Sequence, residues 1–109
     1  MADIVRDSIS LLQIVNREVD MYAGHAAGGK LYPVLDDQNQ TYSVIVIPDD
    51  PKDRPAWVVV MARVIGEHII IDEDTTDKPL LEALMINGGI AREQIILAYA
   101  GETLPENKP

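Results

Sequence analysis

The chain contains no cysteine among its 109 residues. This excludes disulfide bonds, thiolate metal sites and a cysteine nucleophile, and it is compatible with a reducing cytoplasm. No apolar run reaches the roughly 20 residues of a membrane-spanning helix. The segment 2–7 also lacks the basic region and apolar block that mark a signal peptide. We therefore expect a cytoplasmic protein with no membrane partner.

Basic residues are scarce. Nine lysines and arginines stand against 18 aspartates and glutamates, which gives a net charge of −9, and no three basic residues cluster. Nucleic-acid binding depends on neutralising phosphates with a basic face, so we expect no direct binding to DNA. An acidic surface suits a basic protein partner and steers encounter with it. The alternative is that the acidity only keeps a small protein soluble.

Residues typical of catalysis are few. His25 and His68 are the only histidines, and there is no Gly-x-Ser-x-Gly motif. A general base needs a nucleophile and an orienting carboxylate within reach, and the sequence offers no such set for either histidine. The sequence therefore predicts no catalytic residues and a protein that is not an enzyme.

Three segments resemble ligand sites without meeting their requirements. Asp72–Asp77 would need glycine and glutamate as the sixth and twelfth residues of a calcium loop, but Asp77 and Ala83 stand there. The three aspartates within Pro48–Pro55 are better explained as a solvated loop interrupted by prolines. Ala23–Lys30 ends in Gly-Gly-Lys, but a phosphate loop needs Ser or Thr next and a following helix. We therefore expect no metal and no cofactor.

A helix is predicted over residues 3–22, because apolar side chains recur at helical spacing along one face. Ile14 and Met21 lie beyond the edge of that face. A helix that covers one side of a sheet needs only one apolar stripe. The extra pair therefore indicates either a wide core stripe or a contact with another subunit.

Four strands are predicted after a flexible connector at residues 23–29. They cover Lys30–Leu35, Tyr42–Ile47, Trp57–Ile65 and the segment from His68, and form an antiparallel meander. Gly66-Glu67 predicts a type II′ hairpin with glycine first. The strand from Trp57 is apolar at both alternating positions, so both of its faces should be covered. One face would then pack against a second subunit, which predicts a homodimer or larger oligomer.

A second helix and a last strand complete the pattern. Thr76 and Asp77 are natural N-caps, Pro79 suits a first helical turn, and Asn87–Gly89 stops the helix. Gln94–Tyr99 is predicted as a buried strand, which could pair parallel or antiparallel.

The predicted fold is a single α+β domain over residues 1–109. It has an N-terminal helix, an antiparallel four-stranded meander, a second helix and a final strand, with the helices on one sheet face. Residues 1–2 and 103–109 are expected to be flexible ends. The candidate partner or subunit interface consists of Ile14, Met21 and Trp57.

The order of these features carries a resemblance. Val64–Glu102 forms a strand, an acidic turn, a helix ending in glycines, a short AREQ link, an IILAY strand and a Gly-Glu tail. Upstream, Tyr32–Asp37 and Gln40–Val44 form a hairpin that returns through a tyrosine, and Arg54–Val64 supplies the next strand. Together these segments resemble the XisI family, the fdxN element excision controlling factors.

The resemblance implies a non-enzymatic accessory protein that serves DNA rearrangement. In that family a frequent neighbour is XisH, which resembles endonucleases, so the implied partner is a XisH-like protein. The competing hypothesis is a small-molecule or nucleotide-binding module with a cleft near Ala23–Lys30.

Overall fold

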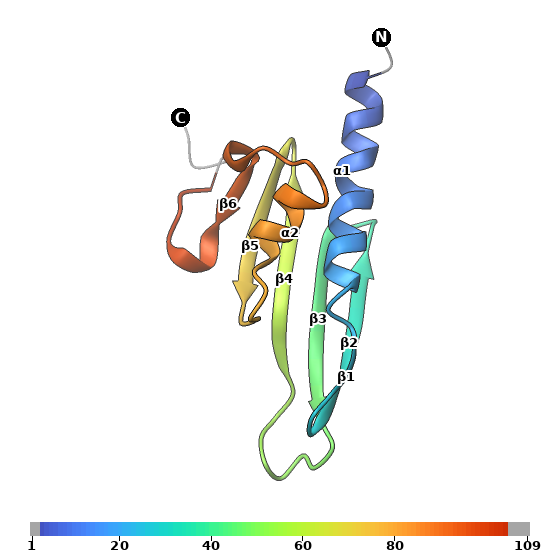
Figure 1. Cartoon of the computed structure of the whole chain (residues 1–109), viewed down its shortest axis with the longest axis vertical. Coiled ribbons are helices and arrows are strands. Elements are labelled where there is room, and N and C mark those ends of the chain that lie inside the picture. The colour runs from blue at the N-terminus through green and yellow to red at the C-terminus, as the bar shows by residue number, and fades with distance from the viewer. Residues whose placement is uncertain (1–2, 105–109) are drawn as a thin grey trace.

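The computed structural model describes residues 3–104, with side chains from residue 11 onward. Residues 1–2 and 105–109, most of the predicted flexible ends, lie outside this part. The six strands form one sheet in the order β1-β2-β3-β4-β5-β6, and all neighbouring pairs are antiparallel except β5–β6 (Figure 1). The elements are α1 (Asp3–Asp20), β1 (Gly24–Ala26), β2 (Gly29–Asp36), β3 (Thr41–Pro48), β4 (Trp57–Ile65), β5 (His68–Asp74), α2 (Leu80–Ile86), the single-turn 3-10 helices η1 (Arg92–Gln94) and η2 (Ala98–Ala100), and between these two β6 (Ile95–Leu97).

Both α-helices pack on the same face of the sheet, side by side (Figure 1). Val15 and Val19 of α1 recur one turn apart, as do Leu80 and Leu84 of α2, and all four are fully buried. They form one cluster with alternate residues of the central strands, which all point to this face because strand side chains alternate. The strand residues of the cluster are Tyr42, Val44, Val60, Ala62, Val64, Ile69, Ile71 and Ile95.

The sheet has two more strands than the predicted four-stranded meander, one of them the predicted final strand. The other is β1, which occupies part of the segment 23–29 that was predicted as a flexible connector. Its three residues pair with Gly29–Leu31, and the turn between them uses Gly28 at φ 83°. The helix before it ends at Asp20 instead of residue 22. A three-residue strand this rich in small residues has no periodic pattern, so only its pairing with β2 defines it.

The final strand is shorter than predicted and parallel to its neighbour. Ile95–Leu97 pairs in register with Ile69–Ile71, while Gln94 belongs to η1 and Ala98-Tyr99 to η2. The sequence left the direction open. The connection through α2 returns the chain to the end of the sheet where β5 begins, so β6 must run parallel to β5.

The second helix begins by a different device from the predicted one. Thr76 and Asp77 do not cap it. The Asp74 carboxylate, from the end of β5, accepts the Leu80 amide at 2.7 Å and the Thr76 amide at 2.9 Å. Pro79 occupies the N-cap position without a side-chain cap bond. The strand end and the helix start are therefore fixed by one carboxylate.

The other face of the sheet has no helix over it. In β4, Val60, Ala62 and Val64 are buried under the helices, whereas Met61, Arg63 and Ile65 on the opposite face are only half-buried. Gly66 between β4 and β5 has φ 61°, as the predicted type II′ turn requires. Within residues 3–104, neither helix combines the length and apolar character needed to cross a bilayer.

Candidate protein-interaction surfaces

The end of α1 and the start of α2 are tied together around Tyr22. Its hydroxyl donates to the Lys78 carbonyl just before α2. The Asp74 carboxylate holds the same connection from the sheet side, through the Thr76 amide and the Thr76 hydroxyl at 2.6 Å. Three elements thus meet at one rigid junction on the helical face.

This junction is surrounded by carboxylates. Burial raises the pKa of the Tyr22 hydroxyl, and the negative charges of Asp74, Glu18 and Glu82 raise it further. Glu18 is nearly buried and pairs with Arg17 at 2.9 Å, with the Asn87 amide as a second donor. Its charge is therefore compensated within the chain.

Asp77 and Glu82 differ from the other acids at this junction. Both are exposed, and neither side chain has a hydrogen-bond or ion-pair partner within residues 11–104. Asp74, Asp77 and Glu82 lie along the segment from the end of β5 to the first turn of α2, which Tyr22 contacts at Lys78, and we call them the Tyr22 acidic surface. Its two unpaired carboxylates remain available to a basic group from outside the chain.

The β2–β3 hairpin shows why an acidic turn is followed by a tyrosine. Tyr42 is fully buried, and its hydroxyl donates to Asp37 at 2.8 Å. Burial and this bond raise the pKa of the Tyr42 hydroxyl strongly. Asp36 accepts from the backbone and side-chain nitrogens of Asn39, which lower the pKa of Asp36. Through these hydrogen bonds, the two acids stabilise the turn.

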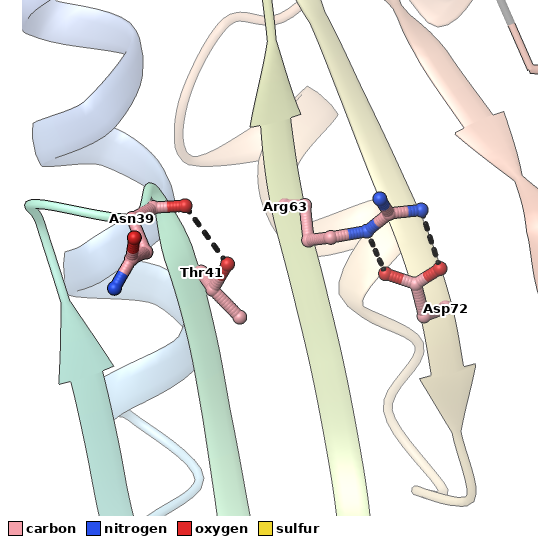
Figure 2. A network of polar contacts seen from close by, with 4 residues as sticks. All are labelled: Asn39, Thr41, Arg63 and Asp72. Atoms are coloured by element: carbon pink, nitrogen blue, oxygen red, sulfur yellow. Dashed lines mark hydrogen bonds and ion pairs between the residues drawn. The ribbon is translucent and has the colours of Figure 1, made fainter.

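Polar contacts also join the strands on the uncovered face. The Arg63 guanidinium donates to Asp72 through two nitrogens, at 2.7 Å and 3.0 Å, between neighbouring strands β4 and β5 (Figure 2). At the hairpin, the Thr41 hydroxyl donates to the Asn39 carbonyl at 2.9 Å (Figure 2). The bidentate pair neutralises Asp72 locally.

The XisI protein family model matches residues 1–106 of this chain. The chain belongs to the XisI family. A XisI-like protein from Anabaena variabilis has the same fold, with a TM-score of 0.72 at 19% identity over 92% of this chain and 91% of that one. The fdxN element excision controlling factor XisI from the same organism gives 0.68 at 17% identity, over 94% and 99%. No curated protein matches the chain.

In this XisI-family chain the acidic run Asp72–Asp77 has three separate structural settings. Asp72 pairs with Arg63, Asp74 organises the start of α2, and Asp77 points to no partner among the described residues. Across residues 11–104, no three metal-binding side chains gather into a possible site. The three carboxylates of the run therefore serve the pairing of β4 with β5, the start of α2 and the surface.

The two histidines lie apart in the sheet order. His25 is exposed on β1, at one edge, whereas His68 begins β5 and is half-buried. Within the described part of the chain, neither side chain makes a hydrogen bond or ion pair. The segment Ala23–Lys30 is a hairpin edge, and its Lys30 ammonium lies 4.8 Å from the Tyr32 ring centroid.

The three predicted interface residues have three different environments. Ile14 is partly buried against the core, and a Cβ added at Gly88 would come within 2.6 Å of its Cγ2. Met21, at the end of α1, is 75% exposed. Trp57 is half-buried, with the Arg54 guanidinium carbon 3.5 Å from its ring centroid. Ile14 thus contributes to packing within the chain, and a role of these residues in partner binding stays a prediction.

Sequence reasoning missed the uncovered apolar residues of β2 and β3. Tyr32, Val34 and Ile47 are each more than a third exposed on the face without helices. Alternation in the two strands could have indicated them, because Tyr32 and Val34 of β2 and Ile45 and Ile47 of β3 lie on the side away from Tyr42 and Val44.

Proposed function

We propose that this protein is a non-catalytic accessory factor that controls a DNA-processing protein by binding it. The observation that carries the proposal is the family match over residues 1–106. The similar structure named as an fdxN element excision controlling factor supports a role in DNA rearrangement. The acidic composition supports action through another protein and not through direct contact with DNA.

The partner that fits best is a basic, XisH-like protein related to nucleases. A nuclease needs a positively charged cleft for the phosphate backbone, and a carboxylate-rich surface is complementary to such a cleft. On this chain the Tyr22 acidic surface offers two exposed carboxylates, Asp77 and Glu82, on a rigid junction of three elements. A rigid docking surface lowers the entropic cost of association.

Co-expression with the XisH-like protein of a neighbouring gene tests the proposal. We expect the two chains to co-purify and the affinity to fall as salt is raised, because exposed charge pairs are screened. The double substitution Asp77→Asn and Glu82→Gln removes two charges and keeps side-chain volume. At about 0.2–1 kcal/mol for each exposed pair, affinity should fall about 2- to 30-fold in isothermal titration.

The matched control is Glu67→Gln with Glu93→Gln. These glutamates are also exposed, without a side-chain partner in residues 11–104, and they lie in the β4–β5 turn and in η1. The control has the same net charge as the test variant and should bind like the parent chain. Absence of any complex, or equal weakening by both variants, would contradict a partner site at the Tyr22 acidic surface. Tight, salt-sensitive binding of naked duplex DNA by the chain alone would contradict the accessory role.

A further inference from the structure

We propose that the uncovered face of β2, β3 and β4 is a homodimer interface, on which a second copy of this chain packs face to face. The register of the strands brings six apolar residues together on this face. We call them the open-face patch: Tyr32, Val34, Ile45, Ile47, Val58 and Met61.

Cross-strand pairing makes the patch continuous. Tyr32 lies opposite Ile45, which lies opposite Val58 on the next strand. One row along, Val34 and Met61 lie on either side of the polar Ser43. Residues paired across strands share a face, so none of these side chains reaches the helical core.

Three residues of the patch are more than a third exposed, and the other three are half-buried. Val34 is 47% exposed, Ile47 44% and Tyr32 39%. Three strands of about eight residues cover roughly 26 Å by 14 Å, on the order of 400 Å², from the standard rise and strand spacing. This footprint includes polar residues such as Ser43. The largest apolar patch on a typical monomer is about 300–600 Å² and is often functional. A standard interface takes about 800 Å² from each partner, so the patch would form its apolar centre.

The adjacent part of the same face is closed within the chain. Ile70 on β5 is fully buried although it lies on the side away from the helices, and its cross-strand neighbour is Arg63. The Arg63–Asp72 ion pair, shown in Figure 2, starts from this side, because Arg63 is the cross-strand neighbour of Ile70. The chain therefore covers the β5 part of the face itself and leaves the open-face patch without a cover.

Charge decides which partner fits the patch. The patch contains no acid, although the chain has a net charge of −9. At its borders lie one lysine and two acids. Lys30 lies opposite Ile47, Glu73 lies opposite Met61, and Asp36 follows Val34 on the same side of β2, whereas the Arg63–Asp72 pair is neutral. A basic protein would find less electrostatic attraction at this patch than at the Tyr22 acidic surface. Two copies of an acidic chain can associate here with less like-charge repulsion than through the Tyr22 acidic surface.

Association through the sheet edges is less favourable. At the β6 edge, the Leu97 amide donates to the Glu102 carboxylate at 2.8 Å, and the Leu97 carbonyl accepts from the Glu102 amide at 3.1 Å. Arg92 donates to the Ile95 carbonyl at 2.7 Å. At the other side, the part of β2 beyond β1 carries Pro33, which cannot donate to an added strand. Because these edge groups are already hydrogen-bonded or lack a donor, an added strand would pair poorly there. The open face is therefore the more favourable surface for self-association.

Light scattering on the purified chain tests the inference, with no partner present. We expect a mass of about twice 12.0 kDa at micromolar concentration. Val34→Glu would bury two carboxylates in an apolar contact, so the mass should fall to that of one chain. Because Val34 is nearly half exposed in a single chain, circular dichroism and the thermal midpoint should still report a folded protein.

The matched control is Ile86→Glu, which places the same charge on a 78% exposed isoleucine of α2 and should leave the dimer intact. If Val34→Glu does not fold, the mass of Ile47→Glu, on the neighbouring strand, tests whether the patch forms the dimer. A parent chain that is monomeric, or a folded Val34→Glu and Ile47→Glu that both remain dimeric, would overturn the inference. The inference does not rest on the proposed function: a monomer that still binds a nuclease-like protein would remove the dimer and leave that function standing.

Discussion

Substitution of Gly88 by alanine should destabilise the fold through a steric conflict between the two helices. Gly88 directly follows the C-cap residue of α2, where α1 passes close by. A Cβ at this position would lie 2.6 Å from the Ile14 Cγ2 and 2.7 Å from the Leu84 carbonyl oxygen. Both distances are shorter than real Cβ contacts, and the carbonyl belongs to the helix backbone, so it cannot rotate away.

Overpacking of this kind costs about 1–3 kcal/mol. At about 4–8 °C per kcal/mol for a domain near this size, the thermal midpoint should fall by about 4–24 °C. Urea unfolding followed by circular dichroism gives the free energy directly, and an unchanged slope shows that only stability has changed.

Gly89→Ala and Ile14→Ala separate the causes. Gly89 has φ 68° and open space around its Cβ position, so alanine there costs only the left-handed backbone conformation, about 1–2 kcal/mol. Ile14→Ala removes one of the two clashing atoms. The double variant with Gly88→Ala should therefore lose less stability than the sum of the single variants. A Gly88→Ala protein as stable as the parent chain would refute the close approach of α1 to this turn.

Three further substitutions follow from single contacts. Tyr42→Phe leaves the ring but deletes the bond to Asp37, and should cost about 1–2 kcal/mol in urea unfolding, since the acceptor is charged but reaches solvent. Asp74→Ala removes the acceptor for the first amide of α2 and should cost about 0.5–2 kcal/mol, as other lost helix caps do. Glu102, whose pKa is held below its usual 4.5 by the Leu97 amide and Arg92, contributes stability above that pH and loses it as pH falls through its lowered value. Glu102→Gln should therefore speed hydrogen exchange of the Leu97 amide at neutral pH, and the parent chain should show the same release only in acid.

Local patterns in the sequence predicted the central strands and both helices, because their signals lie within one element. Val60, Ala62 and Val64 alternate with less buried residues, and Gly66 adopts the positive φ that its turn requires. Hydrophobic periodicity depends on which side of one element is covered, so it can be recognised without knowing the neighbours.

Elements defined by long-range pairing could not be predicted in the same way. β1 has three residues and exists only through its bonds to β2. The apolar run at Ile95–Leu97 has no feature that gives its direction, which follows from the path of the chain through α2 and η1. The cap by Asp74 was missed because it acts six residues ahead of Leu80, beyond the local capping rules.

The two proposed surfaces face in opposite directions, which makes them compatible. Asp74 lies opposite Val60 on the helical side of the sheet, whereas the open-face patch lies on the other side. A dimer through the patch would therefore leave both Tyr22 acidic surfaces outward and unobstructed. Such a dimer could bind two separate nuclease-like partners. It could instead bind one dimeric partner through both acidic surfaces, with an affinity above that of a single contact. The stoichiometry of the purified complex distinguishes these arrangements from a one-to-one pair, and Val34→Glu should convert a two-to-two complex into that pair.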